Sequence, residues 1–342
     1  MAASPTAGNF TCAQILKIQI AADKIAFNNQ ISRDYTPRVG ALTAIRAEQT
    51  AQIAELQDPA KDNVVKIIWA ADCNVTLSAC ADDCVIGGPE PESQCQEHSL
   101  DLCQQASFSI SEKKFRTIQG TREEYVAVSM IRAMKELDEY LAKSLVSKLN
   151  VFAGKNQFLG GIGDPDNNGL TYIESSYWTP DIYGYFSQVQ TMNEFGDVFM
   201  LHGSNLEMMR WQAEKNSVSN NLAPQLEKMN SIKSYWDMFN VDTQNGIEKT
   251  SYMIGRGAVA FFSKAYYGTV PTKYMTQERY SVESKGLPGV FYDVVYNNVC
   301  TANDIKHNWT FYTKAGIALN PLGCNKNVTG VIKFVCGTNA GS

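Results

Sequence analysis

The feature that most constrains this chain is a long amphipathic helix, predicted from Thr121 to Ala153. Gly120 precedes it, and Thr121 and Glu124 form a T-x-x-E capping box in which the hydroxyl and the carboxylate each satisfy a backbone N–H of the first turn. The apolar residues of one face recur at steps of three or four: Val126, Met130, Met134, Leu137, Leu141, Leu145 and Leu149. A helix of this length spans roughly 45–50 Å at about 1.5 Å per residue. It predicts a large flat or elongated body built along one rod.

The opposite face of this helix is charged. Its charged residues are Arg132, Lys135, Glu136, Glu139 and Lys143. Glu139 and Lys143 stand in the i,i+4 order that favours an ion pair, and Gly154 is a typical helix stop. These local signals predict a helix and name no chemistry.

Composition excludes several classes of protein. The 342 residues suffice for two or three packed units or one large elongated one, and 44% hydrophobic with 19% charged residues is ordinary for a folded chain. The net charge is −5 and no basic stripe indicates tight nucleic-acid binding. No apolar run reaches the roughly 18 residues of a membrane span, and the first residues lack the pattern of a signal peptide. We therefore expect synthesis and folding in a cytoplasm.

Nine cysteines are many for a cytoplasmic chain. Cys12 stands alone, and the others fall in one central stretch and one near the end: Cys73, Cys80, Cys84, Cys95, Cys103, Cys300, Cys324 and Cys336. The central group contains no C-x-x-C pair, so its spacing is not that of a zinc ribbon or a redox motif. With His98 nearby, a distorted metal site, disulfides within or between chains, and free buried thiols all stay open. The odd total leaves at least one thiol unpaired or paired across chains.

The first part of the chain predicts an arm that packs on something else, such as a neighbouring chain. Residues 1–9 are small and polar. A short helix is predicted from Thr11, and a second one from Leu42 to Leu56, ending before Pro59. Neither helix has enough apolar surface to form a core alone.

An extended β-hairpin is predicted from Val64 to Phe115. Val64 to Trp69 alternate as in a strand. A polar insert from Asp72 to about Gln96 then carries cysteines and a Gly-Gly-Pro turn, and a second limb returns from Glu97 to Phe115. Because a long two-stranded hairpin is marginal by itself in water, it should pack on the body or lie over another subunit.

The middle of the chain contains partial matches to known motifs. Asp164, Asp166 and Asn168 match the first half of a calcium loop, but Ser175 stands where the final glutamate belongs. Asp, Asn and Gly are also simply turn residues, so calcium binding stays open. The glycines around Arg256 resemble a fragment of a dinucleotide-binding turn without its acidic residue, and a strand-turn-helix packing element is the better interpretation.

Further elements are predicted around these motifs. Asp197 to His202 predicts a strand, followed by a second capping box that begins a helix at Ser204 and Glu207. The end of the chain is strand-rich, with predicted strands at Phe291 to Tyr296, Trp309 to Tyr312 and Val328 to Val335.

No catalytic motif emerges from the sequence. His98, His202 and His307 stand in no metal-binding pairing, and each is predicted to be a surface residue or a satisfied structural one. Cys103 and His98, five residues apart on one strand, would point to opposite faces. The sequence thus predicts no catalytic, cofactor-binding or metal-binding residue, and it favours a protein that is not an enzyme.

The order of these elements resembles the major capsid protein of tailed bacteriophages (Caudoviricetes), with the Hong Kong 97-type fold shared with encapsulins. The order is an N-terminal arm, a long hairpin, a capped long helix, a mixed α/β middle and a strand-rich end. The hairpin, Val64 to Phe115, resembles the extended loop that overlaps a neighbouring subunit in that family, and Thr121 to Ala153 resembles the spine helix. The cysteine-bearing tip, Trp69 to Cys103, resembles a variant found in phages of Bacteroidota hosts.

The resemblance implies an α+β fold with five segments. These are an N-terminal arm at 1–62, the extended loop with its cysteine-rich tip at 63–118, a peripheral domain with the spine helix at 119–190, an axial domain at 191–285, and a strand-rich segment at 286–342 that returns to the body. Some family members crosslink Lys to Asn between subunits, and no position here matches that pattern.

The resemblance also implies a function and a location. The chain would self-assemble as pentamers and hexamers into an icosahedral shell around a double-stranded DNA genome. Its partners would be other copies of itself, portal, scaffold and possible decoration proteins, and packaged DNA contacted non-specifically, with no membrane and no cofactor. It would assemble in the host cytoplasm and reside in the virion, with cysteines fastening the shell as disulfides within or between subunits. A net charge of −5 is compatible with an inner face that does not bind phosphate strongly.

Three alternatives predict different assemblies. An encapsulin-type shell would have the same fold but would hold an enzyme cargo. A metal-dependent hydrolase using Asp164 and Asp166 would be a monomer or small oligomer with bound metal. A tail-tube or other virion component would form rings or tubes.

Overall fold

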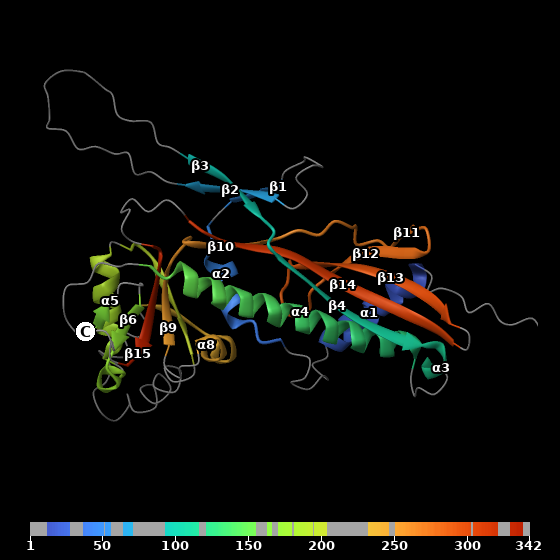
Figure 1. Cartoon of the computed structure of the whole chain (residues 1–342), viewed down its shortest axis with the longest axis horizontal. Coiled ribbons are helices and arrows are strands. Elements are labelled where there is room, and N and C mark those ends of the chain that lie inside the picture. The colour runs from blue at the N-terminus through green and yellow to red at the C-terminus, as the bar shows by residue number, and fades with distance from the viewer. Residues whose placement is uncertain are drawn as a thin grey trace, which may run out of the picture. The chain divides into compact units, whose positions relative to one another are not determined.

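The structure is a computed structural model that describes residues 12–27, 37–50, 52–55, 64–70, 93–115, 121–154, 163–165, 170–179, 181–193, 195–203, 232–245, 250–301, 304–320 and 329–337. These residues combine helices with sheets of mainly antiparallel strands, which confirms the predicted α+β class. Figure 1 shows the described helices and strands, coloured along the chain. The chain divides into two compact units. Unit 1 comprises Met1–Val39, Leu100–Leu141 and Ser263–Gly316, and unit 2 comprises Gly40–Ser99, Ala142–Phe262 and Ile317–Ser342.

The predicted long helix is α4, Arg122–Phe152. Its capping box is confirmed: the Thr121 N–H donates to Glu124 Oε2, and the Glu124 N–H donates to Thr121 Oγ1, each at 3.3 Å. All seven residues of the predicted apolar stripe are buried. By the division of the chain, α4 runs from unit 1 into unit 2.

On the charged face of α4, the ion pair that the sequence favours between Glu139 and Lys143 is not formed. Glu139 pairs instead with Lys135, with Lys135 Nζ 3.9 Å from the carboxylate. Lys143 Nζ lies 5.3 Å from the centre of the Phe239 ring, so Lys143 makes a cation–π contact instead of an ion pair with Glu139.

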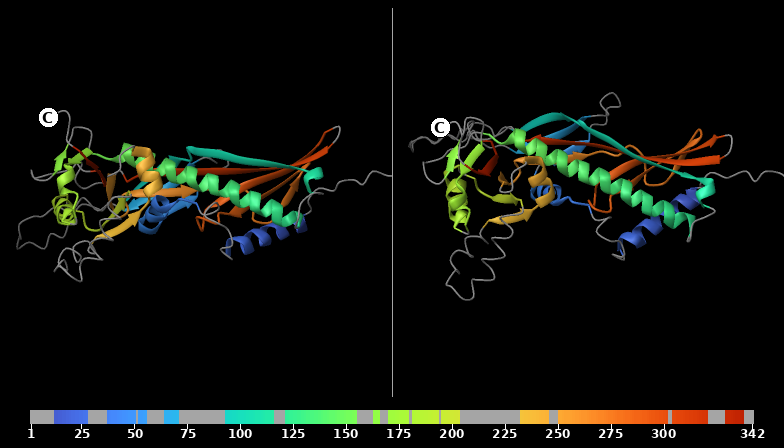
Figure 2. Two further views of the ribbon diagram at one scale, coloured as in Figure 1. Left: turned by 90° about the horizontal axis from the view of Figure 1, so that it is seen from below. Right: turned by 60° about the horizontal axis from the view of Figure 1, so that its bottom comes forward.

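Unit 1 contains an antiparallel sheet in the order β14, β13, β12, β11, with β4 on the other side of β14. Their bounds are β4 Leu102–Ser111, β11 Thr272–Tyr274, β12 Gln277–Glu283, β13 Phe291–Thr301 and β14 Asp304–Leu319, the last of which ends in unit 2. The unit-1 part of α4 lies across one face of this sheet (Figure 2). The large buried side chains of the sheet are Tyr280, Tyr292, Val294, Tyr296, Trp309 and Phe311.

Two helices complete the described part of unit 1. The first is α1, Cys12–Phe27, which confirms the first predicted helix. Ile15, Ile18 and Ala22 recur at steps of three and four along it and are buried. The second is the short α3, Glu112–Phe115, which precedes α4.

Unit 2 contains a mixed sheet in the order β5, β6, β15, β9, β7, β8. The bounds are β5 Gly163–Pro165, β6 Leu170–Ile173, β7 Val198–His202, β8 Lys233–Trp236, β9 Thr250–Gly255 and β15 Val331–Cys336. The helices are α5, Ile182–Met192, α8, Met238–Asn245, and the short 3₁₀ helix Ser175–Tyr177. Aromatic and aliphatic side chains of α5 and of the sheet form one core, centred on Phe186 and Phe334.

The predicted hairpin is confirmed in its first strand, whereas its second strand begins at Ser93, inside the insert that was predicted to extend to about Gln96. β2, Val64–Ala70, pairs antiparallel with β3, Ser93–Ser99, from Val64 opposite Ser99 to Ala70 opposite Ser93. The returning limb is not one strand, because the pairing with β2 ends at Ser99 and β4 joins β14 in another sheet. Alternation along a strand predicts which face is buried, but it does not identify the neighbouring strand.

Two other expectations need correction. The second predicted helix is shorter: α2 spans Gly40–Glu48, and the residues that follow form β1, Gln52–Glu55, which pairs with β2. The glycines around Arg256 lie in a turn from β9 to β10, Val259–Ser263, so a strand follows where a helix was expected. By contrast, the strands predicted at Asp197, Phe291, Trp309 and Val328 are confirmed as β7, β13, β14 and β15.

Candidate functional site

The cysteines predicted as disulfide partners are spread over several elements. Cys103 on β4 and Cys300 on β13 are exposed free thiols, and Cys336 on β15 is partly buried. Cys73, Cys80, Cys84 and Cys324 lie outside the described residues, and of Cys12 and Cys95 only the backbone is described. Cys103 and His98 occupy different strands, β4 and β3, so they do not share the single strand on which the sequence placed them.

Two of the three histidines are buried and satisfied, as predicted. His202 in unit 2 lies between Tyr183 OH at 3.0 Å and Ser251 Oγ at 2.9 Å. His307 in unit 1 lies between Tyr296 OH at 2.8 Å and Glu112 Oε2 at 2.9 Å.

The pKa values of two histidines are shifted in the same direction. Burial lowers the pKa of His307 below its usual value although Glu112 opposes the shift, and burial also lowers the pKa of His98. Low pKa values favour neutral rings, and in His307 the neutral ring suits its hydrogen bonds to Tyr296 and Glu112.

The residues of the partial calcium motif are only partly described. Asp164 lies in β5, which pairs with β6, and Asp166 and Asn168 lie outside the described residues. Ser175 begins a short 3₁₀ helix. Across the described part of the chain, no group of three or more His, Cys, Asp or Glu side chains could hold a metal ion.

A buried acid that sequence reasoning missed lies on α4 in unit 1. Asp138 is 1% exposed and accepts hydrogen bonds from Tyr292 OH at 2.5 Å and from Ser284 Oγ at 2.7 Å. Burial raises the pKa of Asp138 to about 6, although the hydroxyl donors oppose the shift. The sequence signal was available, because Asp138 stands four residues after Met134 on the apolar stripe.

Asp138 also fixes a loop between β12 and β13. Ser284 Oγ accepts from the N–H groups of Gly286 and Leu287 at 3.1 and 3.0 Å while it donates to Asp138. A Cβ at Gly286 would come within 2.0 Å of Pro37 Cγ and 2.8 Å of Asp138 Oδ2, so only glycine fits there.

A buried cation lies in unit 2, where Lys333 projects from the centre of β15. Its Nζ donates to Asn150 Oδ1 at 2.7 Å and to Asn245 Oδ1 at 2.6 Å. Asn150 lies in the last turn of α4, and Asn245 is the last residue of α8. The negative ends of two helix dipoles therefore face the ammonium group. Burial lowers the pKa of Lys333.

Asp237 is a buried acid in unit 2 that binds the N-terminal ends of two helices, whereas Lys333 binds at two C-terminal ends. Its carboxylate accepts from the Ala41 N–H in the first turn of α2 at 2.7 Å and from the Asn240 N–H at the start of α8 at 3.0 Å. One carboxylate thus caps two helix N-termini. Burial raises its pKa, although these donors oppose the shift.

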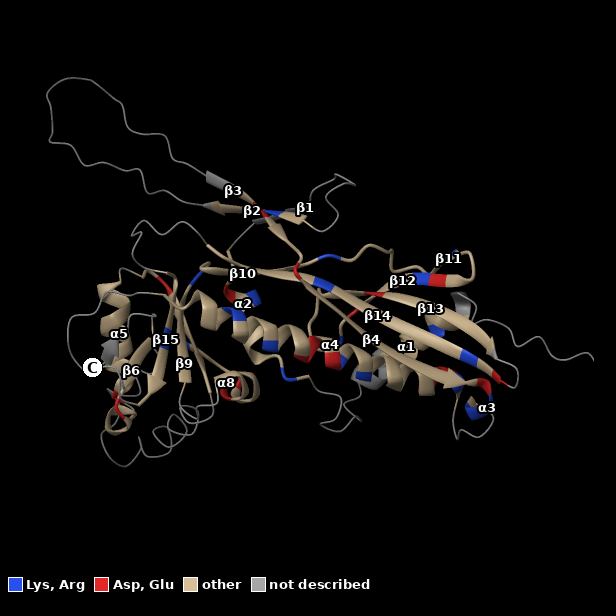
Figure 3. Cartoon of the chain, viewed as in Figure 1, with Lys and Arg blue, Asp and Glu red and all other residues tan. Residues whose placement is uncertain are grey.

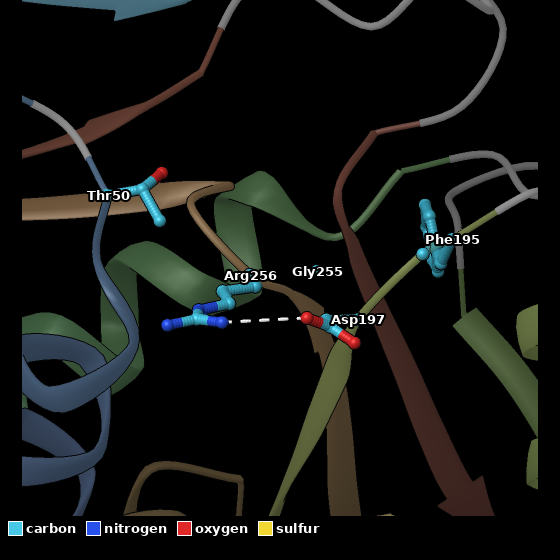
Figure 4. Close-up of a pocket in the computed structure, with 6 residues that line it drawn as sticks. Thr50, Phe195, Asp197, Gly255 and Arg256 are labelled. Atoms are coloured by element: carbon cyan, nitrogen blue, oxygen red, sulfur yellow. Dashed lines mark ion pairs between the residues drawn. The ribbon is translucent and has the colours of Figure 1, made fainter.

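An open pocket of about 420 Å³ lies in unit 2, lined by Thr50, Phe195, Gly196, Asp197, Gly255 and Arg256 (Figure 4). Arg256 Nη1 lies 3.5 Å from Asp197 Oδ2, and the Arg256 N–H donates to the Asp197 carbonyl at 2.9 Å. Gly257 beside it has φ 76°, and a Cβ there would meet Thr50 Oγ1 at 2.1 Å. The turn is therefore shaped to let α2 and the β9–β10 connection approach closely.

Behind Arg256 lies a buried acid. Glu48 accepts from Lys233 Nζ and from Tyr235 OH, the latter at 2.6 Å, and Arg256 Nε lies 3.8 Å away. Burial alone would raise the pKa of Glu48, but the bonds from Lys233 and Tyr235 and the two cations lower it below its usual value. The positive groups at the pocket are thus already balanced by Glu48 and Asp197, which leaves no surplus charge for a phosphate.

None of these clusters pairs a nucleophile with a base beside an open cavity. The buried acids, the buried lysine, His202 and His307 are each held by hydrogen bonds inside a unit. The pocket is lined by an ion pair, two glycines, Thr50 and Phe195. This arrangement fixes elements in place. Among the described helices, none is long and apolar enough to cross a membrane.

No protein-family model and no curated protein matches this chain. It is similar to the capsid asymmetric unit of Cyanophage A-1(L), with 6% identity and a TM-score of 0.49 over 90% of this chain and 95% of that one. It is also similar to the capsid of Cyanophage P-SCSP1u, with 8% identity and a TM-score of 0.46 over 86% and 88% of the two chains. It is similar as well to the capsid of Staphylococcus phage Andhra, with 8% identity and a TM-score of 0.42 over 83% of each chain.

Proposed function

We propose that this chain is the major capsid protein of a tailed bacteriophage, with the Hong Kong 97-type fold. Copies of it self-assemble as pentamers and hexamers into an icosahedral shell around a double-stranded DNA genome. The role is structural and the chain is not an enzyme. Its location is the virion, after assembly in the host cytoplasm.

The observation that carries this proposal is the placement of α4. One capped helix of 31 residues contributes buried residues to both compact units, and the β2–β3 hairpin precedes it in the chain. The two hairpin strands are joined by residues 71–92, which is far longer than a turn requires. This is the order of extended loop and spine helix that the sequence resemblance implies.

The interior of both units supports a structural role. Asp138, Lys333 and Asp237 are each used to tie a helix to a loop, a strand or another helix. A shell protein needs subunits that keep their shape while many contacts form between copies, because closed symmetry multiplies every contact.

The proposal extends to segments and partners. We assign 1–62 to the N-terminal arm, 63–118 to the extended loop, 119–190 to the peripheral domain, 191–285 to the axial domain and 286–342 to the returning strands. Portal, scaffold and possible decoration proteins are the expected partners besides other copies, and packaged DNA is contacted without sequence preference. The thiols of Cys103 and Cys300 are exposed and so available for bonds between copies.

Negative-stain electron microscopy of the purified, overexpressed chain, with light scattering on the same sample, tests the proposal. Closed shells, pentamers or hexamers are the expected result. Tubes would favour a tail component, shells with an enzyme cargo would favour an encapsulin, and a monomer with stoichiometric metal would favour a hydrolase.

The disulfide hypothesis has a separate test. Particles are dissociated and run on gels with and without reductant, and chains linked between copies should separate only when reduced. Identical migration of all chains on the two gels would overturn it.

A further inference from the structure

A patch of tyrosines and cations lies on the face of the unit-1 sheet that is turned away from α4. Tyr292 binds Asp138 of α4, and because side chains alternate along a strand, the adjacent Asp293 belongs to the opposite face. There Asp293 accepts from the backbone N–H groups of Tyr266 and Tyr267, at 3.0 and 3.1 Å. These bonds hold the backbone of both tyrosines against the sheet.

Two lysines lie against one of these tyrosine rings. Lys264 Nζ lies 5.4 Å and Lys314 Nζ 4.1 Å from the centre of the Tyr266 ring, as in cation–π contacts. Figure 3 shows that β14, the strand that contains Lys314, carries lysines. The aromatic ring thus gathers positive charge on this face.

Arg279 on β12 adds a third cation. Its guanidinium lies 4.3 and 5.7 Å from the centres of the Tyr274 and Tyr267 rings, and Nε and Nη2 donate to Gln277 Oε1 at 3.3 and 3.0 Å. Among the described residues no carboxylate pairs with Arg279, and Glu283, further along β12, accepts from a backbone N–H of the β12–β13 loop. An arginine that is already ordered by neutral groups favours an anionic partner. We call this set the tyrosine–cation patch: Lys264, Tyr266, Tyr267, Tyr274, Arg279 and Lys314.

The link between β2 and β3, residues 71–92, carries all of the net negative charge of the chain. It contains no Lys or Arg and five acids: Asp72, Asp82, Asp83, Glu90 and Glu92. The whole chain holds 30 Lys and Arg and 35 Asp and Glu, so the rest of the chain is balanced at 30 of each. The last four residues of the link, PEPE, alternate proline with glutamate. Aromatic surfaces bind proline rings, and Arg and Lys bind carboxylates, so the patch and the link match in both respects.

We propose that the tyrosine–cation patch binds the link between β2 and β3 of a second copy of this chain, with Glu90 and Glu92 at Arg279 and Lys264 and the prolines on the tyrosine rings. Each copy brings one acidic link and one cationic patch, so copies attract one another. The inference rests on the proposed function, because copies meet in the shell. It adds which surface receives the link and which chemistry holds it.

Zero-length crosslinking of particles of the full chain tests the contact. A carbodiimide joins a carboxylate to a lysine amine in contact with it, with loss of water. Particles are assembled from equal amounts of unlabelled and isotope-labelled chain, and peptide mass spectrometry identifies the joined residues. We expect amides from Glu90 or Glu92 to Lys264 or Lys314, with mixed pairs of labelled and unlabelled peptides as frequent as uniform pairs.

Charge reversal supplies the matched variants. Arg279→Glu places like charges together, so it should lower the yield of these amides by about tenfold. Combining it with Glu90→Lys should give a new amide between positions 90 and 279. Lys306→Glu is the control, because Lys306 lies on the same face but about 27 Å from Lys314 along β14, at about 3.4 Å per residue. With Glu90→Lys it should give no amide between positions 90 and 306.

The outcomes separate this inference from the proposed function. Particles with mixed amides that Arg279→Glu depletes support both. Particles that assemble without any amide between link and patch overturn the inference and leave the capsid proposal standing. Amides found only in uniform pairs would place the link on the patch of its own chain and so overturn the role of a second copy. A chain that stays monomeric and unlinked overturns both.

Discussion

Asp138 in unit 1 and Lys333 in unit 2 are both buried charges, and no described ion of opposite sign lies within pairing distance of either. They are solvated in different ways. Asp138, midway along α4, is held by the hydroxyls of Ser284 and Tyr292. Lys333 is held by two carboxamides at the C-terminal ends of α4 and α8. The comparison teaches that dipoles rather than ion pairs offset these two charges, with helix ends serving the cation and hydroxyls serving the anion.

The two charges also give pH dependences of opposite sign. Burial raises the folded pKa of Asp138 from 3.8 to about 6, so between these values the unfolded chain binds fewer protons and stability falls as pH rises. Burial lowers the folded pKa of Lys333 below 10.5, so in the alkaline window below 10.5 the unfolded chain binds more protons and stability rises with pH. At neutral pH the carboxyl of Asp138, with a pKa of about 6, is mostly ionised, so the cost of burying its charge is present.

The largest expected effect comes from removing the buried cation. Lys333→Ala removes a charged donor from the side-chain oxygens of Asn150 and Asn245, which then share the single hydroxyl of Tyr252. It also opens a cavity in unit 2, so it should lower the free energy of unfolding by about 2–4 kcal/mol. Urea unfolding followed by tryptophan fluorescence measures this. Lys306→Ala, at an exposed lysine on β14, is the matched control and should change little. Equal losses of unfolding free energy in the two variants would mean that the contacts of Lys333 with the ends of α4 and α8 do not stabilise the fold.

The acid on α4 is expected to dominate the pH dependence between pH 4 and 6. The rise in its pKa from 3.8 to about 6 corresponds to about 3 kcal/mol, at about 1.36 kcal/mol per unit. Asp138→Asn should remove this fall in stability and leave a flatter profile, measured as the urea midpoint from pH 3.5 to 7. Exposed Asp181→Asn should retain the slope of the unchanged chain. A variant at 138 whose slope equals that of the unchanged chain would contradict the assignment.

A third prediction replaces a carboxamide partner of Lys333 by a carboxylate, which tests whether an ion pair would stabilise this buried cation more than dipoles do. Asn150→Asp supplies a carboxylate within 2.7 Å of Nζ and should raise stability at pH 7 by about 1 kcal/mol, after the cost of an acid at a helix C-terminus. Asn245→Asp should gain less, because the Asn245 Nδ2 donors to the Val241 carbonyl and to Tyr252 OH are lost. Thermal unfolding of the two variants gives their order. The reverse order would show that carboxamide donors matter less than the new charge.

The smallest effect is expected at the exposed start of α4, away from both buried charges. Thr121→Ala removes the hydroxyl that accepts from the Glu124 N–H and should lower stability by about 1 kcal/mol. Thr191→Ala, within α5, is the control, since that hydroxyl bonds back to the Ser187 carbonyl of its own helix and its loss should be near neutral. The melting temperatures of the two variants, from thermal unfolding, measure the two losses of stability. A loss at Thr191 as large as at Thr121 would mean that the capping box contributes nothing specific.

Sequence reasoning was reliable where the signal was local. The capping box and stripe of α4 are set by residues three or four positions apart, and the alternation of β2 by residues two apart. Both were predicted with nearly correct ends. Sequence reasoning failed for the limb from Glu97 to Phe115, because β4 pairs with residues about two hundred positions later, and no local pattern encodes that choice.

The candidate sites divide in the same way. The cysteines and the glycines around Arg256 were visible in the sequence, but their surroundings were not, and the turn at Gly257 proved to be a packing device beside an open pocket. Asp138 on an apolar stripe and Lys333 inside the apolar strand Val331–Cys336 were signals that the sequence carried and that the pattern search passed over.

By itself the sequence determined the spine helix, its cap, the first hairpin strand and the α+β class, because these depend on propensities and periodicities within a few residues. Only the tertiary structure decided which strand β4 joins and how Asp138 and Lys333 are solvated. Those outcomes depend on partners such as Tyr292 and Asn150, 154 and 183 residues away in the chain. Contacts of that separation form only when the whole chain has folded, so the energy of a buried charge is a property of the assembled fold rather than of any segment.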